Sequence, residues 1–156
     1  MDREQLQAYL HHEIPLSREM GVEVGAITPA SVTLAAPLEP NINHKSTVFG
    51  GSISALGILS GWALVHLRLR LAGVDAELVI RANQVAYGAP ARSRFAATAM
   101  PSGTEAWDGA IRQLRRGRMA RFAVSAEIEA DGAVCARFTG EYVAVPRRSA
   151  GGAQGA

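Results

Sequence analysis

The stretch that decides the fold runs from Asn41 to Gly73 and reads NINHKSTVFGGSISALGILSGWALVHLRLRLAG. It begins as a polar loop that carries two asparagines, a histidine and the chain's only lysine, Lys45. The loop leads into the pair Gly50-Gly51, and a long uncharged segment follows. The loop is therefore either a ligand-binding element that leads into the amino end of a helix, or a turn before a buried helix.

The uncharged segment, Phe49 to Leu67, has no Asp, Glu, Lys or Arg over 19 residues. Arg68 and Arg70 follow it, and cations near the carboxyl end of a helix interact favourably with the helix dipole. Gly73 lies where a left-handed residue commonly ends a helix. The pattern predicts one helix from about Gly50 to Ala72. Because this helix is apolar on nearly all sides, we expect it to be buried on most of them.

A membrane span is the alternative interpretation of this segment, because 19 uncharged residues are long enough to cross a bilayer. The segment is, however, rich in glycine and serine. Small residues suit a helix that protein surrounds closely better than one that faces lipid. We therefore predict a soluble protein with a buried helix and no membrane association.

The segments that flank this helix alternate between helical and strand patterns. Residues 2–14 have the pattern of a short amphipathic helix, with Asp2 as its N-cap and Pro15 as its stop. Gly21 to Pro37 indicates either one bent strand or a hairpin. The segments that follow the long helix are predicted as strand, strand, helix, strand and strand: Glu77–Tyr87, Ser93–Met100, Thr104–Arg116, Met119–Ala130 and Ala133–Val145. The pair Asp131-Gly132 between the last two strands is the strongest hairpin signal in the sequence.

Length and composition favour one globular domain over residues 1–146 of the 156, with a Gly- and Ala-rich tail, 147–156, that we expect to be disordered. The net charge of +2 is too small to indicate a partner that is a polyanion. A single cysteine, Cys135, excludes an internal disulfide and suits the cytoplasm.

One apolar helix with several antiparallel strands is an α+β arrangement. A flat sheet would cover only one side of a helix that is apolar all round. The sheet must therefore curl around the helix, or a second copy of the chain must cover the remainder. This requirement predicts an oligomer.

These features resemble the hotdog fold, in which a curved antiparallel sheet wraps a long central helix and the protomers dimerise. The phrase PLSREMGVEV, together with VTLAAPLEPNINHKSTVFGGS, resembles more specifically the thioesterase domain at the C-terminus of some bacterial GNAT-type acetyltransferase fusions. The resemblance covers about Pro15 to Val145. It implies an acyl-thioester substrate and a homodimer or homotetramer.

A second resemblance tests the chemistry. Phenylacetyl-CoA-type hotdog thioesterases carry the pattern N-x-x-G-x-x-H-G-G, followed by an acid seven residues after the last glycine. On this chain the asparagine and the glycine pair are retained, whereas Ser46, Phe49 and Ile58 replace the middle glycine, the histidine and the acid. No Asp or Glu lies between Glu39 and Asp75, so no nearby register supplies the missing carboxylate.

Hydrolysis of a thioester needs an activated water and donors for the oxyanion. The backbone N–H groups of Gly50, Gly51 and Ser52 would be unpaired at the amino end of the helix, and a well-placed donor contributes on the order of 3 kcal/mol. The structural alternative is that the two glycines only allow a tight entry into a crowded helix.

The predicted catalytic residues are Asn43, His44 and Gly51. Asn43 would orient the water or hold the thioester, or would only form an Asx turn. His44 would act as the general base, since an imidazole can accept a proton near neutral pH, or would only be solvated. The predicted substrate-binding residues are Asn41, Lys45, Thr47, Phe49, Gly50, Ser52, Asn83 and Tyr87.

Five arginines between Arg112 and Arg121 could hold the phosphates of coenzyme A or an acidic acyl-carrier protein. They could equally be the basic end of a short helix. No recognised nucleic-acid motif accompanies them, so we expect no nucleic-acid partner. No histidine has partners at metal-ligand spacing, so we expect no metal site.

Two functions follow from these residues. The first is a thioesterase that acts on an acyl-CoA or acyl-carrier-protein thioester and needs no cofactor beyond the coenzyme A of its substrate. The second is a non-catalytic module that binds acyl thioesters, because the usual carboxylate on the helix is absent.

Overall fold

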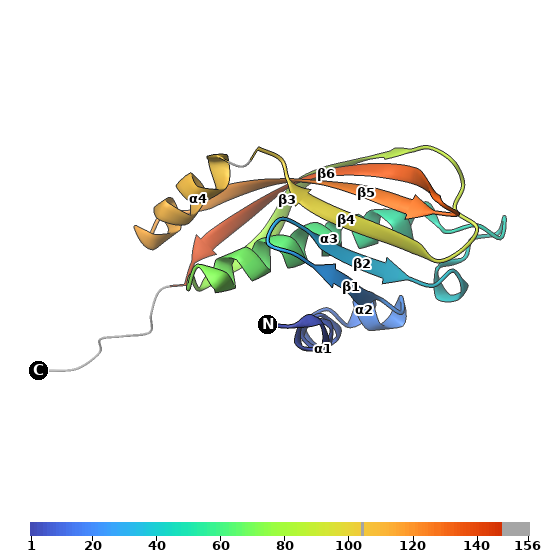
Figure 1. Ribbon diagram of the computed structural model, residues 1–156, viewed down its shortest axis with the longest axis horizontal. Helices are drawn as coiled ribbons and strands as arrows, with labels where there is room; N and C mark the ends of the chain where they lie inside the picture. The colour runs from blue at the N-terminus through green and yellow to red at the C-terminus, as the bar shows by residue number, and fades with distance from the viewer. Residues whose placement is uncertain (104, 148–156) are drawn as a thin grey trace, which may run out of the picture.

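A computed structural model describes residues 1–103 and 105–147 of the chain (Figure 1). One long helix, α3 (Gly50–Leu71), packs against one six-stranded antiparallel sheet with the order β1-β2-β4-β5-β6-β3. The strands are β1 (Glu23–Ile27), β2 (Val32–Ala36), β3 (Ala76–Tyr87), β4 (Phe95–Pro101), β5 (Ala120–Ala130) and β6 (Ala133–Pro146). The predicted α+β hotdog arrangement is confirmed.

The predicted bounds of α3 are almost those observed. Gly73 follows the helix in a left-handed conformation with φ of 65°. Eleven side chains or glycines of α3 are buried. By length and composition alone α3 could cross a membrane, but 61% of its most apolar window is buried inside the protein. It is therefore packed as the core helix of a soluble domain.

The small residues of α3 serve close contact with the sheet. A side-chain carbon on Gly57 would lie 2.9 Å from the ring of Phe138 in β6. One turn later, the ring of Tyr142 occupies the space beside Gly61. The Tyr142 hydroxyl donates to the carbonyl of Ile58 at 2.6 Å, which fixes helix to sheet. Gly57 and Gly61 are thus explained by close packing of α3 against β6.

The amino-terminal helix α1 (Arg3–Glu13) begins at Asp2, whose carboxylate accepts the Gln5 N–H in a capping box. Pro15 does end α1, but it also starts a second short helix, α2 (Pro15–Glu19), which the sequence analysis did not predict. Proline fits the first turn of a helix because its missing N–H would be unpaired there. The two interpretations of residues 21–37 resolve as a hairpin, since β1 pairs antiparallel with β2.

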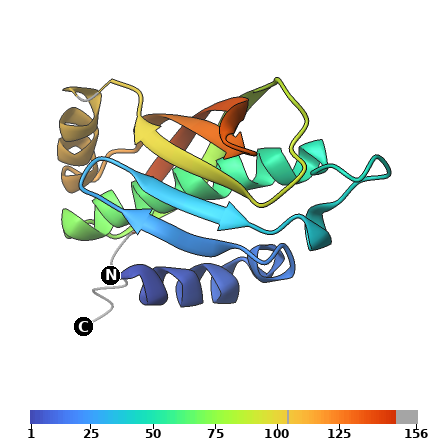
Figure 2. The ribbon, with the colours of Figure 1, turned by 45° about the vertical axis from the view of Figure 1, so that its right-hand side comes forward.

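The two edges of the sheet differ. At the β1 edge, Gln7 accepts the Val24 N–H at 2.9 Å, and the His11 ring hydrogen-bonds the Val22 carbonyl at 2.7 Å. Helix α1 therefore covers this edge (Figure 2). The other edge strand, β3, pairs only with β6; its first six residues alternate between half-buried and exposed, and the rest are exposed except for Val85.

The β5–β6 hairpin turns at Asp131 and Gly132, with φ of 56° and 77°, as the Asp-Gly pair predicts. Helix α4 (Glu105–Arg115) buries Trp107, Ile111 and Leu114, the stripe expected of it. Thr104, where we expected this helix to begin, and residues 148–156 of the expected tail lie outside the described residues.

Candidate functional site

The loop that leads into α3 is organised by Asn43. Its side-chain oxygen accepts the Lys45 N–H at 2.8 Å and the Thr47 N–H at 3.2 Å, and its amide nitrogen donates to the Thr47 hydroxyl at 2.9 Å. Ser46 takes a left-handed conformation with φ of 59° at the tip. Asn43 thus forms the Asx turn, which is one of its two predicted roles. The hydrogen bonds of its side chain are all to residues of the same loop.

His44 and Lys45 lie at the exposed tip of this loop, and Thr47 is half-buried beneath it. The loop holds His44 within a few residues of the start of α3, but among the described residues neither the imidazole nor the Lys45 ammonium has a hydrogen-bond or ion-pair partner. Both groups are therefore free to meet a ligand that approaches the loop from solvent.

Asn41 is buried, with 2% of its surface exposed. Its amide nitrogen donates to the Met20 carbonyl at 2.9 Å and the Pro37 carbonyl at 2.8 Å. Both hydrogens of the amide are used, which fixes its orientation. Asn41 therefore ties the loop to the chain on either side of β1 and β2, while its side-chain oxygen has no partner among the described residues.

The first turn of α3 leaves two backbone donors free. The Phe49 N–H donates to the Asn41 carbonyl at 2.8 Å, and the Ser52 N–H donates to the Phe49 carbonyl at 2.9 Å. Between them, the N–H groups of Gly50 and Gly51 have no acceptor among the described residues. Ser52 is thus already engaged, and the predicted group of three amides reduces to two.

Two aromatic side chains flank these amides. Tyr87, at the end of β3, donates its hydroxyl to the Gly50 carbonyl at 2.9 Å. The ring of Phe49 lies against Gly51 so closely that a side-chain carbon there would overlap it. Phe49 is 56% exposed and carries no side-chain cap for the helix. The site therefore has an aromatic wall where the related pattern has a histidine.

An apolar groove of about 300 Å³ lies beside this turn, between α2 and α3. It is lined by Asn41, Phe49, Gly51 and Ser52 from the predicted site, with Leu16, Glu19, Met20, Pro40 and Ala55. Leu16 and Met20 were missed by the sequence analysis, because nothing in the pattern after Pro15 indicated that α2 approaches α3.

Asn83 does not belong to this group. It lies in a shallow depression on β3 and β6 with Gln84, Thr139 and Glu141, which includes no residue of the loop. It is four residues before Tyr87, about 13 Å along a strand.

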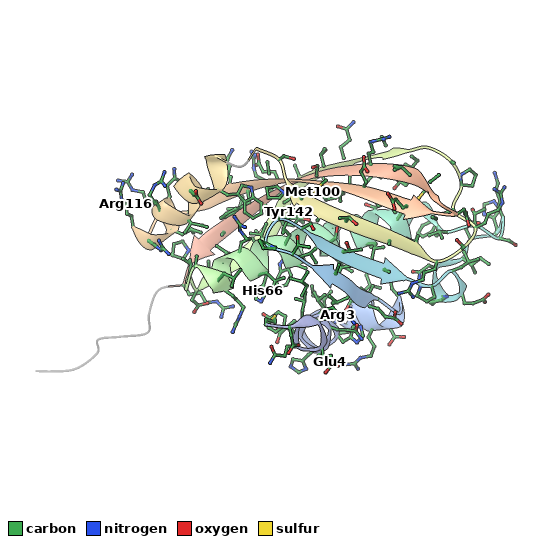
Figure 3. The ribbon with its side chains drawn as sticks, viewed as in Figure 1. Arg3, Glu4, His66, Met100, Arg116 and Tyr142 are labelled. Atoms are coloured by element: carbon green, nitrogen blue, oxygen red, sulfur yellow. The ribbon has the colours of Figure 1, made fainter. Side chains whose placement is uncertain are left out.

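A larger cleft of about 800 Å³ lies between α1, α3 and the start of β3. His66 of α3 stacks there on Tyr9 and on Trp62, with 4.7 Å between ring centroids in each case. Burial, and then the nearby Arg70 guanidinium, lower the pKa of the His66 imidazole from 6.5 to about 4. The ring is therefore neutral at physiological pH. Figure 3 labels His66 on the side of α3 that faces α1.

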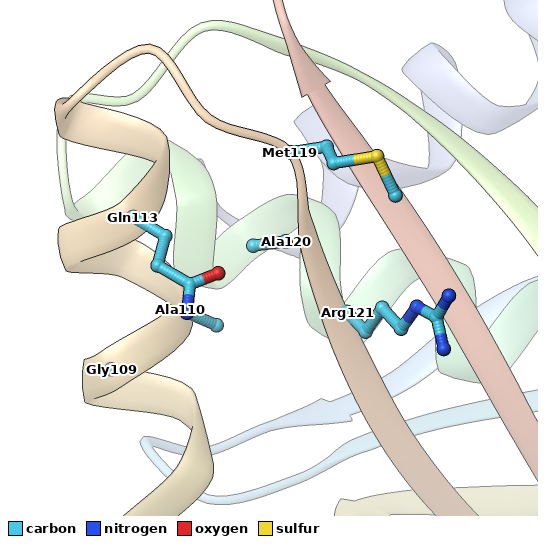
Figure 4. A pocket seen from close by; sticks show the side chains of 6 residues that line it. All are labelled: Gly109, Ala110, Gln113, Met119, Ala120 and Arg121. Atoms are coloured by element: carbon cyan, nitrogen blue, oxygen red, sulfur yellow. The ribbon is translucent and has the colours of Figure 1, made fainter.

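The arginines that could hold a phosphate, and one further pocket, lie near the carboxyl end of α3. Arg112, Arg115, Arg116 and Arg118 are exposed, and Arg115 donates to the Ala72 carbonyl at 3.0 Å, which joins α4 to the end of α3. A pocket of about 360 Å³ between α4 and β5 is lined by Gly109, Ala110, Gln113, Met119, Ala120 and Arg121 (Figure 4). It contains no carboxylate, thiol or imidazole. In the described part of the chain, no cluster of three or more His, Cys, Asp or Glu could hold a metal ion.

The fold is that of the hotdog thioesterases, and comparisons with known proteins give the family. Residues 3–146 match the family model YiiD_C, described as "Putative thioesterase (yiiD_Cterm)". The chain belongs to this family.

Solved structures agree. A "putative thioesterase from Shewanella oneidensis" is 33% identical, with a TM-score of 0.84 over 92% of this chain and 97% of that one. A protein of unknown function from Chlorobaculum tepidum is 26% identical, with a TM-score of 0.87 over 93% and 94%. A thioesterase from Haemophilus influenzae, at 15% identity and a TM-score of 0.70 over 94% and 92%, shares the fold.

Proposed function

We propose that the chain hydrolyses an acyl thioester of coenzyme A or of an acyl-carrier protein at the amino end of α3. The observation that carries this proposal is the pair of free backbone donors, Gly50 and Gly51, beside an apolar groove. The positive end of a helix dipole adds to their effect on a developing oxyanion.

In the proposed reaction, water adds to the thioester carbonyl, the carbon–sulfur bond breaks, and a carboxylic acid and a free thiol are released. The Gly50 and Gly51 amides would stabilise the negative charge on the carbonyl oxygen. His44 would accept the proton of the water and return one to the leaving sulfur. Asn43 would act by holding the loop that presents His44, since its own hydrogen bonds stay within the loop. Lys45 would meet a phosphate of the substrate.

Gly50→Pro tests the oxyanion site without disturbing the helix. Gly50 is the first helical residue, where proline is well tolerated, and Phe49 already has the extended backbone (φ −61°, ψ 133°) that precedes a proline. The substitution removes one N–H group and little else. We expect kcat for thiol release to fall about 10²- to 10³-fold.

Gly50→Ala is the matched control, because it adds a side-chain carbon 3.4 Å from the Tyr87 ring but keeps the N–H group. Equal loss in both variants would contradict the role of the amide. Unchanged turnover in Gly50→Pro would show that the Gly50 N–H group does not bind the oxyanion.

The alternative is a module that binds acyl thioesters without hydrolysing them. The helix α3 carries no acidic residue, which favours this alternative. Saturable binding of acyl-CoA, with no free thiol released from short, medium, long or aromatic acyl-CoAs, would support it and contradict the enzyme.

We further propose that the chain works as a homodimer joined through β3, in the cytoplasm. The open β3 edge supports the dimer, since an uncovered strand of 12 residues is a template for pairing with another chain. Antiparallel pairing would bring the partner's end of β3, and with it the partner's α3 amino end, towards the cleft that contains His66. The single cysteine, buried and hydrogen-bonded to the Ile128 carbonyl at 3.3 Å, suits a reducing compartment.

A further inference from the structure

Five exposed arginines lie at the carboxyl end of α4 and the start of β5. Arg112, Arg115 and Arg116 are three and four residues apart, so they face the same side of the helix. Arg118 lies in the turn that follows, and Arg121 is the second residue of β5. We call these five residues the arginine face, and Figure 3 labels Arg116 on it.

The arginine face has few counter-charges. Other exposed arginines form ion pairs: Arg81 with Glu141 at 2.6 Å, Arg94 with Glu23 at 2.6 Å and Arg137 with Glu127 at 3.7 Å. On the arginine face, only Arg121 has a carboxylate partner among the described residues, that of Glu141 at 3.9 Å. The negative end of the helix dipole accounts for cations in the last turn of α4, but not for Arg118 and Arg121 beyond it. The face therefore presents positive charge that the described residues do not neutralise.

The arginine face projects from the protein and does not enclose a cavity. Helix α4 lies at one end of the molecule (Figure 1), and of the five arginines only Arg121 lines the pocket between α4 and β5. Sites for small molecules are concave and bury most of their ligand. Charges spread over a projecting helix end match instead the surface of a macromolecule, where they steer and orient a partner of opposite charge.

The pocket between α4 and β5 provides an apolar contact beside the arginine face (Figure 4). Met119, which lines it, is 52% exposed. A side-chain carbon on Gly109 would lie 3.7 Å from Arg112 Nη2, so one guanidinium of the arginine face borders the pocket directly. Arg121 borders it from β5. An apolar centre with a charged rim is the usual composition of an interface between proteins.

We propose that the arginine face and this pocket dock an acidic acyl-carrier protein, which presents its acyl group as a thioester. This inference rests on the proposed function and names a carrier protein, not free coenzyme A, as the partner that delivers the thioester. Carboxylates of the carrier pair with the arginines, and an apolar side chain of the carrier packs on Met119.

The position of the arginine face decides which site a docked carrier serves. Helix α3 has 22 residues and is about 33 Å long, so the face lies far from the Gly50 amide of its own chain. Antiparallel pairing through β3 brings the partner's α3 amino end towards this end of the molecule. A carrier docked on one chain therefore delivers its acyl group to the site of the partner.

The double variant Arg116→Glu and Arg118→Glu tests the charges. Both side chains are exposed and form no hydrogen bond or ion pair among the described residues, so the fold should persist. The probe is a bacterial acyl-carrier protein whose phosphopantetheine thiol carries an alkyl group as a thioether, which cannot be hydrolysed. We expect its dissociation constant to rise at least about tenfold at low salt, and the affinity of the unaltered protein to fall as salt is added. The KM for thiol release from acyl-CoA should stay unchanged.

The double variant Arg3→Glu and Arg92→Glu is the matched control, because it changes the net charge equally at exposed arginines of other elements. Met119→Ser tests the apolar contact and should weaken binding of the carrier about three- to tenfold. Met100→Ser, at an exposed methionine of β4, is its control and should leave binding unchanged.

Carrier affinity that is absent in the unaltered protein, or equal in the Arg116 and Arg118 double variant, would overturn the docking surface. An equal loss of affinity for acyl-CoA would assign these arginines to the phosphates of coenzyme A and would overturn it too. A short DNA duplex bound as tightly as the carrier would show that the face attracts any polyanion, which also contradicts the proposal. Absent thiol release would contradict hydrolysis alone, because the thioether affinities are measured without turnover.

Discussion

His66 is a half-buried titratable residue of α3, with a buried ring nitrogen that has no hydrogen-bond partner among the described residues. Tyr9 and Trp62 stack on it, and Glu13, Arg70, Asp75, Glu77 and Arg147 share its cleft. Its lowered pKa means that the folded protein resists a proton that the unfolded chain accepts. Folding stability from this residue is therefore complete above pH 6.5 and is lost as the pH falls towards 4.

We expect the melting temperature to fall across this pH window in the unaltered protein and to fall less in His66→Phe, which keeps an aromatic ring but cannot titrate. Melting followed by circular dichroism at several pH values measures the difference. The pKa values of Asp131 and Glu141 are lowered by hydrogen bonds to Ser93 and to Arg81, so these two groups add a further loss of folding stability at the acid end of the range. They are present in both proteins and cancel in the comparison. Parallel pH profiles would contradict the role of His66.

At the residue scale, the residue types of the loop before α3 did not specify what each group does. The two readings of Asn43 could not be separated beforehand, because an Asx turn and a catalytic amide need the same residue in the same loop. The engagement of Ser52 depends on the exact first turn of α3, which residue types do not specify. Asn41 was predicted to bind the substrate, and its hydrogen bonds to the Met20 and Pro37 carbonyls could not be predicted because they depend on tertiary contacts.

At the scale of the element, α1 acts as a cover for the edge of β1. Gln7 and His11 lie one turn apart on the same face; Gln7 pairs with the Val24 N–H of β1, and His11 pairs with the carbonyl of Val22, the residue before β1. We expect the double variant Gln7→Ala and His11→Ala to lose about 1–3 kcal/mol of stability. The exposed edge should also promote association of chains, because unpaired edge groups template new strand pairs.

Denaturant unfolding measures the first effect, and light scattering at raised concentration measures the second. Glu4→Ala is the control, since Glu4 lies on the exposed face of the same helix (Figure 3). A double variant as stable and as soluble as this control would show that α1 does not protect the edge.

The elements themselves were largely predictable because local signals are strong in this chain. Asp2, Gly73 and the Asp131-Gly132 pair each fix a boundary by a backbone preference that needs no tertiary contact. The start of α2 was missed because proline both ends α1 and begins the next helix, and only the fold decides between these roles. The pairing of β3 with β6, rather than with its neighbour in sequence β4, also depends on contacts between distant residues.

At the scale of the whole molecule, the sheet covers α3 incompletely and leaves β3 as its open edge. Val79, the fourth of the twelve residues of this strand, is 57% exposed. Glu77 and Arg81 lie on either side of it and carry opposite charges, so two antiparallel copies can place each beside its counter-charge. The sequence indicated that something must cover the helix, but it could not choose between a curled sheet and a partner, because both bury the same apolar surface.

If two copies pair through β3, Val79→Glu should dissociate them. It replaces an apolar contact with two like charges next to each other, and like charges directly opposite in a sheet are destabilising. Sedimentation at several concentrations should show a dimer for the unaltered protein and a monomer for the variant. Met100→Glu is the matched control, because Met100 is an exposed apolar residue at 43% on β4, away from this edge. A Val79→Glu protein that stays dimeric would place the interface elsewhere. A monomer that keeps full thiol release would show that each chain forms a complete site by itself and that the partner contributes nothing to it.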